Sequence, residues 1–154
     1  VFPEPEAMLT TTPKLLGIDG RKMSKSYDNA INLSDSPEIL KKKVASMFTD
    51  PKRIRLSDKG HPEHCNVYTY YSIFVPEMKE AVYDWCTNAK VGCTECKKRL
   101  AQGLLEKLAP LHARRAELVQ DKAVILNILK QGREKACDVA AATMKDVAAA
   151  MQML

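Results

Sequence analysis

The sequence predicts a mostly α-helical protein whose irregular structure is confined to the segment before Ser34. From Ser34 onward, apolar residues recur three or four positions apart, as on one face of an α-helix. Residues 1–33 instead contain many prolines, threonines and glycines and show little helical period, so they read as loops and short extended pieces. With 154 residues, 45% of them hydrophobic, the chain can bury a sizeable core.

The first three helices are placed by their boundary residues. We expect one helix over residues 36–48, because a serine or aspartate in the run SDSPE can cap it and Pro37 fits its first turn, where a missing N–H costs little. A second helix is expected to begin at Pro62 and to run to Pro76. A short third helix should cover residues 77–87.

A longer helical pattern follows. Leucines recur on one face over residues 93–120, which predicts a single long helix that Pro110 should kink. Asp121 is a suitable N-cap for a helix over residues 122–131. We expect Gly132 to separate that helix from a final alanine-rich one.

The chain is moderately basic, which favours an anionic partner. Lysine and arginine number 24 against 19 acidic residues, for a net charge of +5. Any one basic cluster, taken alone, is typical of a solvated helix face. No apolar run reaches the roughly 18 residues that a membrane span needs, so no membrane partner is expected.

The segment DGRKMSKS at residues 19–26 combines three cations, two serines and a glycine. That chemistry suits a polyphosphate, because ammonium groups act as point charges on phosphate oxygens and hydroxyls donate hydrogen bonds to them. Gly20 lets the backbone turn, so that its N–H groups can also reach an anion. A solvated surface loop is the alternative that the segment alone leaves open.

The run KMSKS at residues 22–26 resembles the signature loop of class I aminoacyl-tRNA synthetases. Its flanks, FPEPEAMLTTTPKLLGIDGRKMSKSYDNAINL over residues 2–33 and FTDPKRIR over residues 48–55, resemble the bacterial tryptophanyl-tRNA synthetases almost residue for residue. The pattern is looser through the helical remainder. The resemblance implies a tryptophan–tRNA ligase, which activates tryptophan with ATP and transfers it to tRNA.

The resemblance also implies roles for the loop residues. Lys22 and Lys25 would be catalytic, because they would neutralise the charge that spreads onto the departing pyrophosphate. Mg²⁺ would accompany the ATP, with no protein ligand assigned to it in this chain. The residues implied to bind ATP are Lys22, Met23, Ser24, Lys25 and Ser26, with Met23 anchoring the loop by packing.

The domain organisation follows from the same resemblance. Residues 1–33 would form the end of a Rossmann-like catalytic domain with the KMSKS loop, and residues 34–154 a helical bundle that binds the tRNA anticodon. Nothing in the sequence resembles the family's second motif, of the HIGH type, and Val1 opens directly into family sequence. We therefore expect a C-terminal part of a longer enzyme, inactive by itself. The resemblance implies a cytoplasmic homodimer for the full-length enzyme.

Four of the five cysteines form a cluster with the spacing C-x20-C-x6-C-x2-C: Cys65, Cys86, Cys93 and Cys96. Disulfides would need an oxidising compartment, which a translation enzyme does not normally see. The C-x2-C turn at Cys93 projects two thiolates to one side, and the following helix N-terminus stabilises sulfur charge. A metal site is therefore expected, whereas Cys137 is expected to be buried and structural.

Two metals remain open for these cysteines. Zinc usually takes two short C-x2-4-C knuckles, but only one short pair is present here. An iron–sulfur cubane tolerates wider spacing, because each iron takes its own cysteine. Some tryptophanyl-tRNA synthetases carry a C-x22-C-x6-C-x2-C pattern that binds a 4Fe-4S cluster, and this chain departs from it only by x20 in the first interval. The resemblance thus implies a 4Fe-4S cluster, with Zn²⁺ as the alternative.

The partner implied for the helical part is tRNA(Trp). The candidates for contact with its backbone are Lys41, Lys52, Arg53 and Arg55, although either arginine could instead pair with an acidic residue. Trp85 is expected to pack beside the metal site. Two other functions stay open: a stand-alone RNA-binding helical module, and an iron–sulfur sensor derived from a synthetase.

Overall fold

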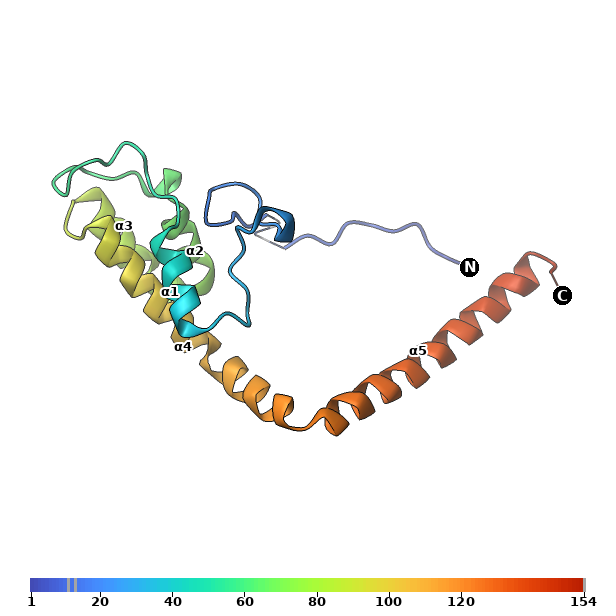
Figure 1. The fold of residues 1–154 in the computed structure, drawn as a ribbon. Helices are drawn as coiled ribbons and strands as arrows, with labels where there is room; N and C mark the ends of the chain where they lie inside the picture. The colour runs from blue at the N-terminus through green and yellow to red at the C-terminus, as the bar shows by residue number, and fades with distance from the viewer. Residues whose placement is uncertain (11, 13, 154) are drawn as a thin grey trace. The chain divides into compact units, whose positions relative to one another are not determined.

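The computed structural model describes residues 1–10, 12 and 14–153, and the chain divides into two compact units. One unit is Leu9–Pro110, and the other combines Val1–Met8 with Leu111–Leu154. The predicted fold class is confirmed, because helices dominate both units (Figure 1). Among the described residues there is no β-strand, only an isolated antiparallel bridge between Leu16 and Lys22.

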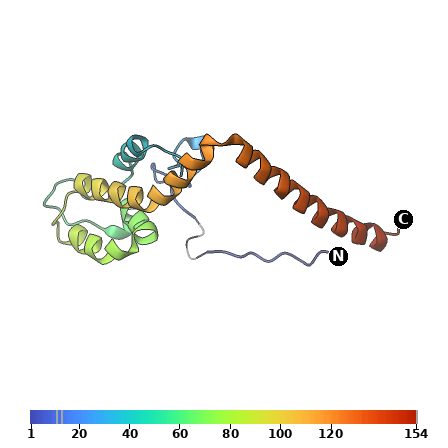
Figure 2. The ribbon, with the colours of Figure 1, turned by 90° about the horizontal axis from the view of Figure 1, so that it is seen from below.

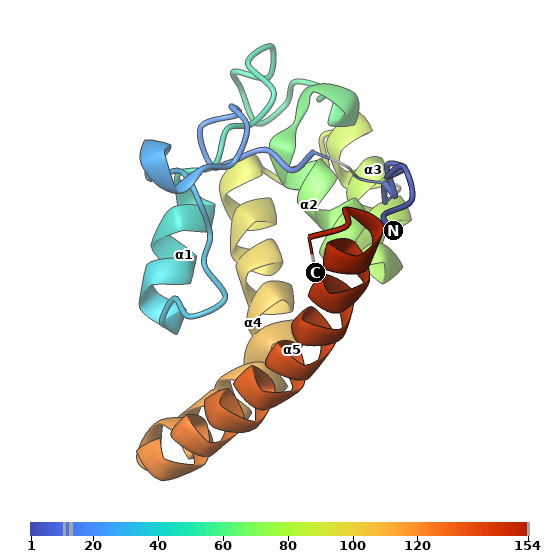
Figure 3. The same ribbon diagram turned by 90° about the vertical axis from the view of Figure 1, so that its right-hand side faces the viewer.

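Four helices build the unit Leu9–Pro110. They are α1 (Pro37–Ala45), α2 (Asn66–Phe74), α3 (Lys79–Thr87) and the first part of α4 (Cys93–Gln120). This part of α4 lies between α1 on one side and the α2–α3 pair on the other (Figures 2 and 3). Short 3-10 turns precede α2 and α3, at Pro62–His64 and Pro76–Met78, and a third one lies at Lys25–Tyr27.

The core of this unit comes from the apolar stripes that the sequence predicts. The buried side chains are Leu40, Val44 and Met47 from the α1 segment, Val67, Tyr70, Tyr71 and Val75 from α2 and its end, Val82 from α3, and Leu100, Ala101 and Leu104 from α4. Each helix buries one face, so the hydrophobic effect fixes which faces meet. The positions of the loops before α1 and α2 depend on this core.

Helix α1 is shorter than predicted. Ser36 caps its first turn by accepting from the Ile39 N–H, and Pro37 is its first residue, as expected. The helix ends at Ala45 rather than at residue 48, because the backbone N–H of Phe48 donates to the carbonyl of Ile18 at 2.8 Å. A tertiary hydrogen bond has replaced the helical one. By contrast, α4 spans the predicted residues Cys93–Gln120, with Pro110 inside it.

Helix α5 (Lys122–Ala150) corrects two expectations about the other unit. Asp121 caps it as predicted, but the helix continues through Gly132 instead of breaking there. One glycine costs a helix about 1 kcal/mol, too little to interrupt a run of alanine, leucine and lysine. Cys137 is exposed rather than buried, because α5 buries none of its residues. In the described part of the chain, no helix is long and apolar enough to cross a membrane.

Candidate nucleotide-binding loop and cysteine site

The KMSKS segment is held in a closed loop by its own backbone. The Gly17 N–H donates to the Arg21 carbonyl at 2.7 Å, and the Met23 N–H donates to the Leu15 carbonyl at 3.0 Å. Gly20 lies at the turn with φ +80°, a left-handed conformation that glycine adopts without strain. The candidate phosphate-binding residues therefore come directly after a turn that a backbone hydrogen bond closes.

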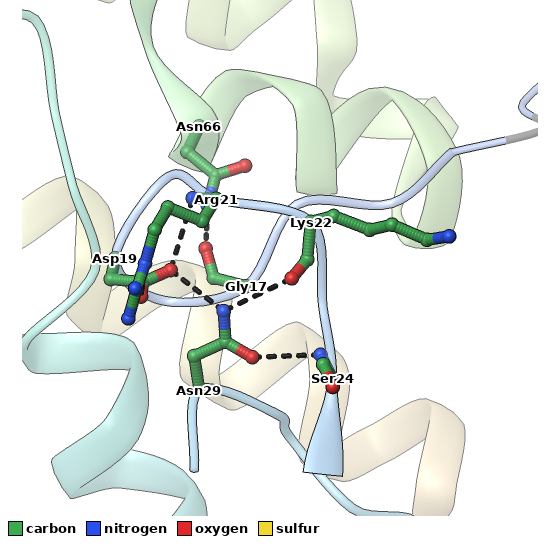
Figure 4. A network of polar contacts seen from close by, with 7 residues as sticks. All are labelled: Gly17, Asp19, Arg21, Lys22, Ser24, Asn29 and Asn66. Carbon is green, nitrogen blue, oxygen red and sulfur yellow. Dashed lines mark hydrogen bonds and ion pairs between the residues drawn. The ribbon is translucent and has the colours of Figure 1, made fainter. Parts of the chain in front are cut away.

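Asn29 organises this loop from inside. Its side chain is 2% exposed, and its Nδ2 donates to Asp19 at 2.8 Å and to the Lys22 carbonyl at 3.2 Å (Figure 4). Its Oδ1 accepts from the Ser24 N–H at 2.8 Å. The buried side-chain amide of Asn29 thus connects Asp19, which precedes the KMSKS motif, to backbone groups of Lys22 and Ser24 within the motif.

The charge on Asp19 is stabilised by the same contacts. The hydrogen bond from Asn29, together with those from Arg21, lowers the pKa of Asp19 to about 2, against a smaller opposing effect of desolvation. The Arg21 Nε lies 2.6 Å from this carboxylate, and the Arg21 guanidinium stacks 4.5 Å from the centroid of Tyr27. Arg21 is therefore occupied within the loop.

Helix α2 anchors the loop through two side chains. The Asn66 Nδ2 donates to the Gly17 carbonyl at 2.8 Å, and the Tyr70 hydroxyl donates to the Leu16 carbonyl at 2.7 Å. Asn66 is 3% exposed, and burial raises the pKa of Tyr70 to about 12, so its hydroxyl stays protonated as a donor. The loop backbone is thereby bound to the core of the unit.

The motif's two lysines lie at the surface of the loop. Lys22 and Lys25 are exposed, and neither forms an ion pair with any carboxylate in the described residues. Figure 4 shows the Lys22 side chain pointing away from the Asn29 contacts. The hydroxyl of Ser24 accepts from the Ser26 N–H at 3.3 Å, capping the turn Lys25–Tyr27. Two ammonium groups on a braced turn form a suitable anion clamp.

Met23, between the two lysines, is partly buried. It packs against the hydrophobic core and lines an apolar cavity of about 180 Å³ with Leu15, Ile31 and Tyr70. Its position thus matches the packing role expected of it, while direct contact with a nucleotide stays a prediction.

The four clustered cysteines line one cavity. Cys65 precedes α2, Cys86 lies in α3, and Cys93 and Cys96 lie in the first turn of α4. Trp85 lines the same cavity, as expected, and the Arg99 guanidinium lies 4.7 Å from the centroid of its ring. The fold therefore brings together sulfur atoms from three segments that are separate in the sequence.

Close approach of a loop to Cys86 depends on a glycine. A Cβ atom at Gly60 would overlap the Cys86 sulfur and lie 3.2 Å from the Arg53 Cδ. The Gly60 N–H donates to the Cys86 carbonyl at 2.9 Å, so the loop lies directly against α3. The Tyr71 hydroxyl donates to the Cys96 carbonyl at 3.0 Å on the α2 side. Both contacts brace the cavity wall.

The electrostatics of this cavity disfavour four bare thiolates. Burial raises the pKa of Cys96 to about 12, and charge on the other three sulfurs contributes to the same rise. Burial likewise raises the pKa of Cys65, although backbone groups of Tyr68, Asp50 and Val67 partly offset it. Because these pKa values are raised, a nearby cation would favour the thiolates of Cys65 and Cys96.

The four thiols are suitable donors for a metal, but the present distances between them do not match a coordination geometry. Its volume is only about 20 Å³, so a cubane would require the sulfurs to turn outward. Across residues 1–10, 12 and 14–153, no three His, Cys, Asp or Glu side chains lie close enough to hold a metal ion as they stand. The donor set is assembled, whereas its coordination geometry is not.

The four candidates for tRNA contact do not form one cluster. Arg53 and Arg55 line a polar hollow of about 620 Å³ beside Cys93, whereas Lys41 lies on α1. The Arg53 guanidinium donates to the Leu56 carbonyl at 3.1 Å, and neither arginine forms an ion pair among the described residues. Lys52 is exposed, and its N–H donates to Asp50 at 2.9 Å.

Sequence reasoning did not identify the polar residues that brace the loop. Asn29, Asn66 and Tyr70 have no distinctive spacing, and their importance depends on contacts with backbone groups that are distant in the sequence. The only available signal was the presence of two asparagines beside singled-out positions, one near the motif and one after Cys65.

Comparison with known proteins identifies relatives of the whole chain. The family model for class I tRNA synthetases (W and Y) matches residues 1–109. A tryptophan–tRNA ligase of Thermotoga maritima is 44% identical over 100% of this chain and 48% of its own length. That of Aquifex aeolicus is 43% identical over 99% of this chain and 39% of its own length. The chain thus spans about half the length of these relatives, or less.

A solved structure gives the same result for the fold. The tryptophanyl-tRNA synthetase of Campylobacter jejuni, complexed with ADP and tryptophan, superposes with a TM-score of 0.80 at 27% identity. The match covers 94% of this chain and 45% of that protein. The arrangement of elements described above is therefore shared with that structure.

Proposed function

Since the chain belongs to the class I tRNA synthetases of the tryptophan and tyrosine group, we propose that it serves as the C-terminal part of a tryptophan–tRNA ligase. The observation that carries this proposal is the KMSKS loop itself. Asn29, Asn66 and Tyr70 brace its backbone, while the ammonium groups of Lys22 and Lys25 have no acidic partner among the described residues.

The proposed reaction needs no protein nucleophile. The carboxylate of tryptophan attacks the α-phosphorus of ATP, the bond to the bridging oxygen breaks, and pyrophosphate departs with the electron pair of that bond. Lys22 and Lys25 stabilise the negative charge that gathers on the pyrophosphate oxygens, and Ser26 adds a hydroxyl donor. A ribose hydroxyl of the 3′-terminal adenosine of tRNA then attacks the tryptophanyl carbonyl, and AMP departs with the electron pair of the anhydride bond. Mg²⁺ bound to the ATP would neutralise phosphate charge alongside the lysines.

A chimeric enzyme tests this function directly. The chain would replace the matching segment of the Thermotoga maritima ligase, and tryptophan-dependent exchange of pyrophosphate into ATP would be measured. We expect exchange near that of the parent enzyme, and a roughly 100-fold lower rate for Lys25→Ala, a typical cost of losing one charge-stabilising group. Tryptophan affinity should stay unchanged.

Matched variants make the outcome clear. Lys14→Ala removes an exposed lysine that lies outside the motif, and it should leave exchange unchanged. A folded chimera that binds tryptophan but exchanges no pyrophosphate would overturn the assignment. So would a Lys25→Ala chimera as active as its parent.

The helical part is proposed to bind tRNA(Trp), with residues 34–154 as the anticodon-binding domain and residues 1–33 as the end of the catalytic domain. Arg53 and Arg55 support this, because they line a hollow where their guanidinium groups lack acidic partners among the described residues. Lys41 and Lys52 are exposed candidates for backbone contact. The full-length enzyme is proposed to be a cytoplasmic homodimer.

A 4Fe-4S cluster is the proposed resident of the cysteine site, with Zn²⁺ as the alternative. Cys65, Cys86, Cys93 and Cys96 would hold it, because these four sulfurs share one cavity, and charge on the other three contributes to the raised pKa of Cys96. The cluster would join α2, α3 and α4 covalently through their ligands and so stabilise the RNA-binding part.

Metal analysis of anaerobically purified protein distinguishes these ligands. Iron and sulfide with a broad absorption band in the visible region would support the cluster. Stoichiometric zinc in a colourless protein would favour the alternative. A folded protein that binds neither metal after anaerobic reconstitution would overturn the proposed site.

A further inference from the structure

The structure brings two basic runs, distant in sequence, onto one groove. Lys41 and Lys42 of α1 and Lys97 and Lys98 of α4 line a hollow of about 510 Å³ between the two helices. The remaining lining residues are two alanines, Thr94 and Gln102, so none of the described residues that line the groove carries a carboxylate. Four lysines on two walls concentrate positive potential between them.

The exposed lysines of this groove differ from several other basic residues of the unit that are held in ion pairs. Arg21, Lys43, Lys90, Arg99 and Lys107 each pair with a carboxylate at 3.0 Å or less. Lys41, Lys42 and Lys98 form no ion pair with any carboxylate among the described residues, although Glu38 acts on Lys41 from a distance. Their charges remain available to a ligand.

The fourth lysine fixes the two walls to each other. Lys97 is half-buried, and its Nζ donates to the carbonyl of Ala45, at the last turn of α1, at 3.0 Å. A cation at this end also suits the helix dipole. The floor includes Ala45 and Ala101, whose small side chains let an extended polymer approach the backbone of both helices. The groove is thus formed before any ligand arrives.

We propose that this α1–α4 groove holds a stretch of RNA phosphodiester backbone without reading its bases. Lysine ammonium groups neutralise successive phosphates, while Thr94 and Gln102 donate to phosphate or ribose oxygens. No aromatic side chain among the described residues lines the groove to stack a base, which favours backbone contact over base recognition. The inference rests on the proposed tRNA-ligase function and adds a second contact surface to it.

Salt dependence of RNA binding tests the groove. Fluorescence anisotropy would follow the intact chain as it binds labelled tRNA(Trp) and a labelled RNA stem-loop of unrelated sequence, from about 50 to about 300 mM KCl. The double variant Lys42→Gln/Lys98→Gln should bind both RNAs roughly tenfold more weakly. The slope of log affinity against log salt should fall in magnitude by nearly 2, because two phosphate contacts are lost.

A charge-matched control separates the groove from net charge. Lys59→Gln/Lys79→Gln removes two exposed lysines that lie outside the groove, and its salt slope should change by much less. Circular dichroism of both variants would establish that the fold is retained. Equal slopes for the two double variants would overturn the proposal. So would poly-glutamate competing as well as RNA at equal charge, which would indicate an acidic protein instead.

The groove and the proposed function fail in different ways. Suppose that the Lys42→Gln/Lys98→Gln variant loses salt-dependent binding, and that the parent chain binds tRNA(Trp) and the stem-loop equally well. This result would support the groove and count against anticodon recognition. If the chain prefers tRNA(Trp) over the stem-loop and the Lys42→Gln/Lys98→Gln variant binds both RNAs as tightly as the parent, the result would support anticodon recognition and overturn the groove.

Discussion

The side-chain amide of Asn29 donates to the carboxylate of Asp19 across ten residues of sequence, at 2.8 Å. This bond lies at the base of the KMSKS loop and connects the turn before the motif to the segment after it. Because Asn29 also binds the Lys22 carbonyl and the Ser24 N–H, its loss would free both arms at once. The order of the loop therefore depends on a residue outside the motif.

Asn29→Ala should raise the pKa of Asp19 from about 2 toward its ordinary value near 3.8, because the largest charge-stabilising hydrogen bond is removed. A lowered pKa means that the contact stabilises the loop above about pH 4 and is lost as the pH falls toward about 2. Carboxyl-carbon NMR titration measures this shift. Arg21→Gln should raise it less, and an unchanged Asp19 pKa in Asn29→Ala would contradict the network.

Two adjacent lysines should differ in their effect on stability. Lys43 lies 2.7 Å from Asp35 and 2.8 Å from the Ala30 carbonyl, and its side chain is 19% exposed. Lys43→Met should lower the free energy of unfolding by about 1–3 kcal/mol, between the values typical of surface and buried pairs. Lys42→Met, without such a partner, should stay within about 0.5 kcal/mol. Urea unfolding would compare them.

The same pair predicts a pH dependence. Burial pushes the pKa of Asp35 up, but hydrogen bonds from Lys43 and Asn32 outweigh it, and the pKa is lowered. The pair thus contributes stability above the ordinary pKa, and that contribution is lost as the pH falls through the lowered value. Stability measured from about pH 6 down to about pH 3 should fall less steeply in Lys43→Met than in the parent. Parallel curves would count against the pair.

Substitutions should distinguish a cavity-lining cysteine from the fifth cysteine, Cys137, by their effect on metal content. Cys96→Ser removes one of the four sulfurs that line the cavity, so metal affinity should fall by more than the roughly 10–100-fold typical of lost outer-shell contacts. Cys137→Ser changes an exposed thiol on α5 and should leave metal content unaltered. Elemental analysis of both proteins after anaerobic reconstitution would check this. Equal metal content would place the ligands elsewhere.

Gly132→Ala should stabilise α5. A Cβ atom at Gly132 would meet nothing within 4 Å, and the residue lies inside a continuous helix. Replacing it should raise helix stability by about 1 kcal/mol, because alanine loses less backbone entropy. Ellipticity at the helix minimum during thermal unfolding would report the change. Gly17→Ala is the contrasting variant, since its Cβ would lie 2.7 Å from the Asn29 carbonyl and should destabilise the loop.

Local signals in the sequence predicted the helices and failed where tertiary contacts competed. The bounds of α4 and the Asp121 cap follow from leucine spacing and capping chemistry alone. The early end of α1 depends on Ile18 taking the Phe48 N–H, a distant partner that no local pattern reveals. The predicted break at Gly132 is wrong, because one unfavourable residue does not outweigh a long favourable run.

The sequence predicts which residues carry the chemistry of the candidate site, but not which residues hold them in place. The KMSKS lysines and the four cysteines stand out by residue type and spacing. The roles of Asn29 and Asn66 required the fold, since each is a lone amide whose value depends on which backbone groups surround it. The α1–α4 groove likewise required the fold, because its two lysine runs are far apart in the sequence and meet only when α1 packs beside α4.

Cys65 and Asn66 are neighbours at the start of α2, and they face two different sites. Cys65 lines the cavity of the four cysteines, while the Asn66 side chain donates to the Gly17 carbonyl in the KMSKS loop. Adjacent residues at the start of one helix thus contact both the cysteine cavity and the KMSKS loop. A substitution that displaces the backbone at Cys65 is therefore expected to disturb the Gly17 contact as well.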